Sequence, residues 1–263
     1  MLAFPQLRTG AMAQYPLVRR RITGGLTNSL SDGSVVTHAE SAPRLNRWEL
    51  EFRDLTDVEA ESLRKLFQAV EGRRGTFTFI DPSANLLAHS GELDNTCWSK
   101  GPMMQVANGI DDPLGGAQAL RLINSGQTDQ ALSQTLPAPA WFMFCMSVYA
   151  RSVSSSSMNL TRAAASDVHS RVFMPGSAWE RWVLSGALNS SGESVTFSLV
   201  LPPGGSVDVF GIQAEPQPAS SAYKRTGSRN GVFSHARFDD DVLRLVSDGP
   251  DQHRCDLRIV ARD

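Results

Sequence analysis

Strict alternation of apolar and polar residues marks the first ordered segment of the chain. Residues 47–53 place Trp48, Leu50 and Phe52 on one face and four charged side chains on the other. This pattern predicts an antiparallel strand with one face toward solvent. Residues 76–80 return to the same period of two. We therefore expect both segments to belong to one antiparallel sheet.

A helix is predicted between these two strands. Thr56 and Glu59 have the spacing of a capping box, and apolar residues follow at helical intervals as far as Val70. Gly72 then supplies a C-terminal stop. Weaker patterns in the same part of the chain predict strands at 15–23, 233–238, 243–245 and 255–261, and a hairpin around the turn at 31–34.

The middle of the chain has no helical periodicity and consists of short β-rich runs. Gly, Pro, Ser and Asn separate these runs, and Asn108–Gly109 and Gly204–Gly205 are the sharpest turn signals. Regularly spaced short strands are typical of an all-β sandwich or barrel. The runs span residues 118–124, 130–136, 141–151, 157–162, 171–174, 180–187, 193–201 and 206–213.

Charge density changes at the same places as the hydrophobic pattern. Residues 85–227 hold 8 of the 25 basic and 10 of the 27 acidic residues of this 263-residue chain, so the shorter remainder holds 17 of each. Two ends of one composition around a middle of another predict a discontinuous domain, 1–84 and 228–263, interrupted by an insertion. The predicted fold class is mainly β: an antiparallel domain with one helix, plus an inserted β-sandwich at 85–227.

Composition excludes several classes of protein. A net charge of −2 is too balanced for nucleic-acid binding by bulk charge, so we expect no nucleic-acid partner. The longest apolar run, residues 141–146, is far too short to span a bilayer, and the first residues lack the features of a secretory signal. We expect synthesis in the cytoplasm. Cys97, Cys145 and Cys255 are odd in number and widely spaced, which predicts buried free thiols.

Motifs for nucleotide, zinc and serine-nucleophile chemistry are missing from the sequence, so we expect no enzyme, no cofactor and no metal. The acidic run 239–241 is interpreted as a solvated turn, because a strand edge supplies too few oxygens for calcium. The five histidines are scattered and are interpreted as ordinary surface or turn residues. A glycan-cleaving enzyme stays an alternative, since it needs only two carboxylates about 5–10 Å apart. The candidates in the middle segment are Glu180, Glu193, Asp208 and Glu215.

Tryptophans suggest a binding surface in the middle segment. Trp141 and Trp182 lie in or beside apolar strands and are interpreted as core residues. Trp98 and Trp179 lie at predicted loop edges beside polar residues. These two are the candidate ligand-binding residues, because an exposed indole provides an apolar face against which a sugar ring stacks.

The two ends of the chain resemble the distal tail proteins of long-tailed bacteriophages and gene transfer agents. The resemblance lies in residues 4–16, in the strand that begins Arg47–Trp48–Glu49–Leu50, in the helix after it, and in 75–82 (GTFTFIDP). In that family this last segment soon leads to one similar to 236–241. Here about 145 residues intervene, in agreement with the insertion inferred from charge density.

This resemblance implies a structural role in a tail tip or baseplate. The chain would form a homo-hexameric ring between the tail tube protein and the central hub protein, in a virion or phage-like particle assembled in the host cytoplasm. Ring closure needs a heterologous interface. The candidate interface residues are Arg19, Arg20, Arg21, Glu49 and Glu51.

The inserted segment resembles carbohydrate-binding jelly-roll modules of phage tail and fibre proteins. Such a module would recognise host-surface polysaccharide or other tail components. A stand-alone lectin-like adhesin is the first alternative for the whole chain, and a glycan-cleaving enzyme is the second. The resemblance rests on residues 85–87, 95–100, 144–151, 209–215 and 220–223.

Overall fold

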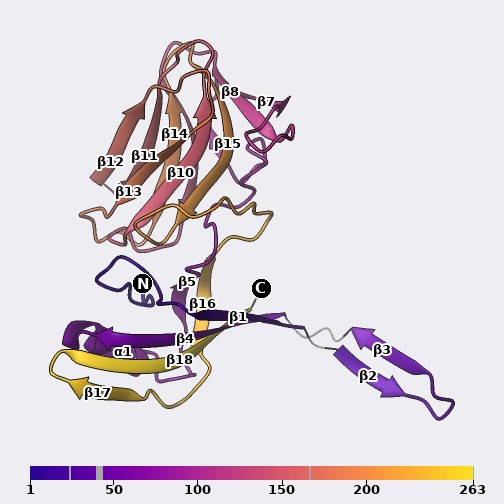
Figure 1. Cartoon of the computed structure of the whole chain (residues 1–263), viewed down its shortest axis with the longest axis vertical. Coiled ribbons are helices and arrows are strands. Elements are labelled where there is room, and N and C mark those ends of the chain that lie inside the picture. Colours follow the sequence, from indigo (N-terminus) through magenta and orange to yellow (C-terminus); the bar gives the residue numbers. More distant parts are fainter. Residues whose placement is uncertain (24, 40–43, 166, 263) are drawn as a thin grey trace. The chain divides into compact units, whose positions relative to one another are not determined.

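A computed structural model of the chain describes all residues except 24, 40–43, 166 and 263. It contains two compact units, whose elements are labelled in Figure 1. The unit boundaries fall at 79/80 and 232/233, and residues 6–12 belong with the middle of the chain rather than with its ends. The sandwich unit comprises residues 1, 6–12 and 80–232, and the terminal unit comprises 2–5, 13–79 and 233–263.

The terminal unit is one sheet with one helix. The strand order is β1-β4-β18-β16-β5, with β17 paired to β18, and β2 and β3 form a separate hairpin. The strands β1, β4, β18 and β16 pair antiparallel. The elements are β1 (Leu17–Ile22), β2 (Gly25–Ser29), β3 (Val35–Ala39), β4 (Leu45–Leu55), α1 (Asp57–Ala69), β5 (Phe77–Ile80), β16 (Val232–Phe238), β17 (Leu245–Gly249) and β18 (Gln252–Arg262).

The predicted strand and helix are confirmed. Trp48, Leu50 and Phe52 on β4 are at most 1% exposed, and α1 packs against β4 and β18. The capping box closes in both directions: the Glu59 amide donates to Thr56 Oγ1 at 3.3 Å, and the Thr56 amide donates to the Glu59 carboxylate at 2.9 Å. Satisfying these amides lets the helix begin directly after the strand.

Strand β5 departs from its predicted half-exposed character, because all four of its residues are buried. The N-terminal residues run beside it: the Phe4 amide donates to the Thr78 carbonyl at 2.8 Å, and the Thr78 amide donates to the Leu2 carbonyl at 2.9 Å. The Phe4 ring also packs against Phe79, with centroids 5.6 Å apart. A covering segment distant in sequence therefore removes the solvent-facing side.

The sandwich unit is a jelly roll of two five-stranded antiparallel sheets. The first sheet has the order β13-β10-β15-β8-β7, and the second has the order β12-β11-β14-β9-β6. From β8 to β15 successive strands alternate between the two sheets, except that β11 and β12 are neighbours in the second sheet. The strands are β6 (Ser99–Lys100), β7 (Met104–Ile110), β8 (Ala119–Asn124), β9 (Gln130–Leu136), β10 (Phe144–Arg151), β11 (Met158–Ala164), β12 (Asp167–Phe173), β13 (Glu180–Gly186), β14 (Val195–Leu201) and β15 (Ser206–Glu215).

The two sheets enclose an apolar core. Phe144 of the first sheet meets Phe197 of the second with ring centroids 5.5 Å apart, and both side chains are fully buried. Strands β6 and β7 lie outside the predicted runs. The predicted turn at Asn108–Gly109 is wrong: both residues lie within β7, where the pairing with β8 shifts register and Gly109 adopts a φ of 79°. A bulge uses the same left-handed backbone that a turn would need.

Residues 6–12 complete the sandwich unit. The Gln6 side chain makes the two hydrogen bonds that the backbone of a paired strand would make. Its amide nitrogen donates to the Met143 carbonyl at 2.9 Å, and its oxygen accepts from the Met143 amide at 2.7 Å. Gly10 has a φ of 82°, and a Cβ there would meet the Met143 side chain at 2.9 Å. A segment that the sequence assigned to the ring domain is therefore tied to the insertion by specific contacts.

Candidate functional site

The outward face of the first sheet carries a row of charged and aromatic side chains, which we call the first row. Arg151 on β10 is paired in register with Asp208 on β15, and Asp208 is paired with Arg121 on β8. Trp179, just before β13, continues the row, since the Arg151 guanidinium lies 4.8 Å from its ring centroid. Strand pairing thus aligns residues that are widely separated in the sequence.

Asp208 is the fixed centre of the first row. Its carboxylate is 2% exposed and accepts from Arg121 Nε at 2.6 Å, from Arg121 Nη2 at 3.1 Å and from Arg151 Nε at 3.1 Å. Burial raises the pKa of Asp208, but the two guanidinium groups outweigh this effect and hold the pKa below its usual value. A buried carboxylate is stable only when it is paired in this way.

A second row runs beside the first and is mostly aromatic. Arg181 on β13 lies over Tyr149 at 5.2 Å, Tyr149 packs against Phe210 at 6.2 Å, and Phe210 packs against Tyr223 at 5.3 Å. Arg181 also donates to Ser147 Oγ at 2.9 Å. Tyr149 and Phe210 come into register through a bulge in β15, where Gly211 has a φ of 64°.

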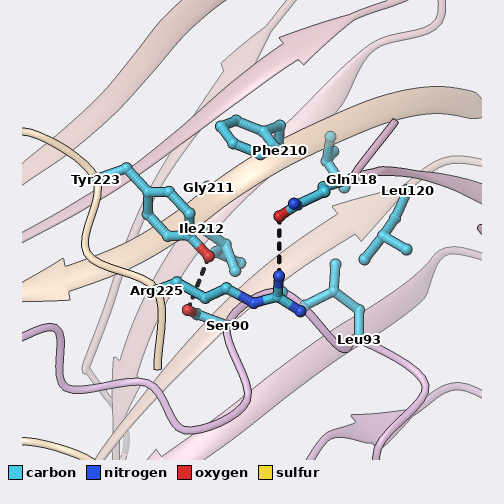
Figure 2. Close-up of a pocket in the computed structure, with 11 residues that line it drawn as sticks. Ser90, Leu93, Gln118, Leu120, Phe210, Gly211, Ile212, Tyr223 and Arg225 are labelled. Carbon is cyan, nitrogen blue, oxygen red and sulfur yellow. Dashed lines mark hydrogen bonds between the residues drawn. The ribbon is translucent and has the colours of Figure 1, made fainter. Parts of the chain in front are cut away.

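One end of the second row closes into a small pocket (Figure 2). Tyr223 Oη lies 3.0 Å from Ser90 Oγ, and the Arg225 guanidinium donates to the Gln118 side chain at 2.8 Å. Burial raises the pKa of the Tyr223 hydroxyl. The pocket holds about 10 Å³, enough for one water molecule but not for a sugar ring.

A larger hollow lies beside the first row. It has a volume of about 150 Å³, and the two arginines and the carboxylate of that row form one wall. The loop after β10 and the start of β15 form the rest, through Ser152, Val153, Ser154 and Ser206. Charged groups and hydroxyl groups therefore converge on one concave surface, and the Trp179 indole lies against one of its arginines. Polar groups converging on a hollow beside an aromatic face are the usual composition of a small-ligand site.

The two tryptophans predicted to bind a ligand, Trp98 and Trp179, differ in exposure and in surroundings. Trp179 is half-buried and belongs to the first row. The expected exposure of Trp98 is wrong: it is 3% exposed, and its Nε1 donates to the His89 carbonyl at 3.2 Å. Trp141, interpreted as core, is 45% exposed, because β10 begins three residues later than its apolar pattern suggests. Trp182 is half-buried and packs against Phe173.

No direct signal in the sequence identifies the partners of Trp179. Arg121, Tyr149, Arg151 and Asp208 lie on three strands, and only the pairing register brings them together. Tyr149 on β10 and Asp208 on β15 each stand between apolar neighbours, and Arg151 follows Tyr149 at the same period of two. This pattern indicates an outward face but not its partners.

Cysteine exposure also differs from expectation at one position. Cys145 and Cys255 are buried, and burial raises the pKa of each thiol to about 11. Cys97 is exposed rather than buried, because it follows Asn95 in a turn on the surface. All three are free thiols.

The four carboxylates considered as candidates for glycoside hydrolysis do not form a catalytic pair: three of them are ion-paired, and the two buried ones lie far apart. Glu215 is fully buried, with Lys224 Nζ at 3.2 Å, and Asp208 is held by two arginines. These two residues are seven positions apart on β15, which corresponds to about 20 Å along a strand. Glu193 pairs with the N-terminal amine, and Glu180 is exposed at the start of β13. The buried pair therefore lies well beyond the spacing that either hydrolytic mechanism uses.

Charged groups of the terminal unit are largely paired within the chain. Arg20 meets Glu49 at 2.8 Å, Arg53 meets Glu51 at 3.2 Å, and the Arg19 guanidinium lies over Trp48 at 5.5 Å. Arg21, the third of the predicted interface arginines, also lies on β1, with its backbone paired to Asn46. Both glutamates among the interface candidates are therefore ion-paired within the chain, in a charged band across β1 and β4.

Two further polar clusters in the terminal unit have structural partners. The acidic run expected as a solvated turn pairs with arginines: Asp239 with Arg47, Asp240 with Arg258 and Asp241 with Arg73. His253 links Ser247 and Asp57 at 2.9 and 2.6 Å, which joins β17 and β18 to the first turn of α1. The side chain of His38 lies outside the described residues. Among the residues that are described, no group of three metal-ligating side chains is found, and no helix is long and apolar enough to cross a membrane.

Comparisons with known proteins find similarity in solved structures alone. No family model and no curated protein matches the chain. The enzymatically active domain of tailspike protein 4 of bacteriophage CBA120 aligns with 52% of this chain at 14% identity and a TM-score of 0.41. This chain covers 22% of that tailspike chain.

Carbohydrate-binding modules are also among the similar structures. The CBM22-1 xylan-binding domain of Paenibacillus barcinonensis Xyn10C aligns with 54% of this chain and 99% of its own, at 16% identity and a TM-score of 0.41. TmCBM61, in complex with beta-1,4-galactotriose, aligns with 50% of this chain and 98% of its own, at 12% identity and a TM-score of 0.41.

Proposed function

We propose that the chain is a non-enzymatic structural component of a phage or phage-like tail tip. Its terminal unit forms a homo-hexameric ring between the tail tube and the central hub, and its sandwich unit binds host-surface glycan. The observation that carries the binding role is the pair of rows on the first sheet, where the Arg121 and Arg151 guanidinium groups line an open hollow and aromatic rings lie against the arginines of both rows. Sugar rings bind by stacking on aromatic faces and by hydrogen bonds to such polar groups.

Support for the ring role comes from the terminal unit. Apart from residues 6–12 and 80–82, which belong to the sandwich unit, the segments that resemble distal tail proteins lie in this unit: β4, α1 and β5 follow one another, and β16 and β18 complete the same sheet. The β1 and β4 surface offers charges of both signs. A closed ring needs two different complementary patches on each subunit, and alternating charge suits such a contact.

The ring is tested by the mass of the full chain in solution and in reconstituted tails. Reversing Glu49 and Glu51 to Lys should lower the hexamer fraction, more strongly at low salt, because rim charges act through a screened field. Folding should persist, since exposed ion pairs contribute at most about 1 kcal/mol each. An unchanged mass distribution at low salt would exclude this band as the interface.

Glycan binding is tested separately by titrating the full chain with a panel of neutral and acidic oligosaccharides while following tryptophan fluorescence. Binding without turnover supports the proposal, whereas release of reducing ends would indicate the enzyme alternative. A monomer that binds glycan would indicate a stand-alone lectin-like adhesin. Electron microscopy of the particle with this chain labelled tests the proposed location at the tail tip.

A further inference from the structure

The hollow beside the first row carries more positive charge than its carboxylate neutralises. Arg121 and Arg151 both face Asp208, so the cluster has a net charge of +1. Arg181 lies on β13 opposite Tyr149, which is two residues before Arg151 on β10. Its guanidinium donates to the Ser147 hydroxyl, and no carboxylate pairs with it among the described residues. A neutral ligand does not require this excess, and in a concave surface it attracts anions.

Donors remain available on Arg151. Its Nε hydrogen bonds to Asp208 and its plane lies against Trp179, while both terminal nitrogens have no acceptor in the described part of the chain. The side chain is 27% exposed and lines the hollow. A guanidinium presents its terminal hydrogens as a fork that matches the two oxygens of a carboxylate or phosphate.

The surrounding residues hold this fork in place. Asp208 is almost fully buried and binds both arginines, and the Trp179 ring restricts the other face of Arg151. The opposite wall is ordered as well: Ser152 Oγ donates to the Ser206 carbonyl at 2.9 Å, and the Ser206 amide donates to Ser156 Oγ at 3.0 Å. A site whose donors are already oriented loses little conformational entropy when the ligand binds.

We propose that this hollow binds the anionic group of an acidic sugar, with Arg151 and Arg121 contacting the anion and Trp179 stacking on the ring. Asp208 is a positioning residue that orients both guanidinium groups. The inference deepens the proposed glycan-binding function and rests on it. The ligand class is a sugar with a carboxylate or a phosphate, since both present paired oxygens to a guanidinium.

The test compares matched ligands on the full chain by isothermal titration calorimetry. Trigalacturonate and its methyl ester have the same sugar backbone, but the ester has lost the negative charges and carries a methyl group on each carboxyl; galactose 6-phosphate against galactose distinguishes phosphate from carboxylate recognition. We expect the charged member of one pair to bind at least 10-fold more tightly, with affinity falling as salt rises. Tight binding in the phosphate pair alone would assign the anion as phosphate.

Variants separate the site from a general effect of positive charge. Arg151→Gln should weaken binding of the acid at least 10-fold and weaken binding of the ester much less, and Arg151→Lys should recover only part of the lost affinity for the acid. Arg171→Gln is the matched control, because Arg171 lies over Phe173 at 5.0 Å on the second sheet. It should bind like the unmodified chain. Thermal unfolding of each variant verifies folding.

Two results would overturn the inference, and they are distinguishable from each other. Equal affinity for charged and neutral members of both pairs would leave glycan binding intact and remove the anion site. An equal loss of acid binding in Arg151→Gln and Arg171→Gln would show that net charge, not this hollow, attracts the acid. Failure of every glycan in the wider panel to bind would instead contradict the proposed binding function itself.

Discussion

At the scale of single residues, the tryptophans show how burial decides role. Trp98 and Trp179 both lie beside polar residues in the sequence, yet Trp98 is buried with its indole hydrogen bonded and Trp179 is half-buried against the Arg151 guanidinium. The difference depends on which segment covers each ring. Trp98 supports the fold, whereas Trp179 keeps part of its ring exposed at the first row, where the proposed function has it meet a ligand.

This difference predicts opposite effects of the same substitution. Trp98→Ala should lower the free energy of unfolding by about 3–5 kcal/mol, since a buried indole is lost. Trp179→Ala should remove the fluorescence response to glycan with little change in melting temperature. Trp141→Ala is the control, because Trp141 is exposed and outside both rows. Strong destabilisation by Trp179→Ala would place that ring in the core.

The ion-paired Asp208 predicts a pH-dependent contribution to stability. Because the folded-state pKa lies below the unfolded value of about 3.8, the carboxylate stabilises the fold at neutral pH, and this contribution is lost as pH falls through the folded pKa. Asp208→Asn should cost roughly 1–3 kcal/mol at pH 7. Urea unfolding at pH 7 and in the acid range should show the difference between the two proteins shrinking below pH 4. If the two proteins differed by the same free energy of unfolding at every pH, the lowered pKa of Asp208 in the folded state would be contradicted.

At the scale of elements, the structure of a segment depends both on signals within its own sequence and on contacts with segments that are distant in the sequence. The capping box placed α1 correctly because its hydrogen bonds lie within four residues. Strand β5 lies where the sequence predicts it, but the face predicted to be exposed is buried, because residues 2–5 pair with this strand. The turn signal at Asn108–Gly109 became a bulge because β8 pairs on both sides of it. Local chemistry therefore specifies backbone conformation more reliably than it specifies partners.

The helix cap provides a test at this scale. Thr56→Ala removes the side-chain acceptor and should lower stability by about 1 kcal/mol, whereas Thr56→Ser should retain most of it. Differential scanning calorimetry of the full chain should show the shift in the transition of the terminal unit alone. Ser62→Ala, at a half-buried position of the same helix outside the cap, should leave both transitions nearly unchanged. A shift in the transition of the sandwich unit would contradict this assignment.

At the scale of the whole molecule, the insertion enters and leaves the terminal sheet at adjacent points. Strands β5 and β16 are neighbours in that sheet, and the Asp81 amide donates to the Gly231 carbonyl at 2.8 Å. An insertion whose ends meet need not disturb the sheet that carries it. Both units also have their own apolar cores, around Trp48 and around Phe144.

Removal of the insertion is therefore expected to leave a folded domain. Replacing residues 84–228 with a short Gly/Ser linker should preserve cooperative unfolding, because loop length changes the closure free energy by only about 0.6 kcal/mol per doubling. Calorimetry and circular dichroism measure whether the shortened chain still unfolds in one cooperative transition. Residues 6–12 lose their partner Met143 in this variant, so their deletion is the matched second variant. Loss of the cooperative transition in both variants would contradict independent folding of the terminal unit.

The sequence by itself determined the mainly β class, the capped helix, most strands and the change of composition that marks the insertion. These features depend on alternation, capping and turn residues, which act over a few positions. Tertiary structure alone decided which tryptophan is accessible, that residues 6–12 join the sandwich unit, and that Trp179, Arg151, Asp208 and Arg121 form one row. The physical reason is that strand register is set by pairing across the sheet, and a single bulge such as the one at Gly211 changes which side chains meet.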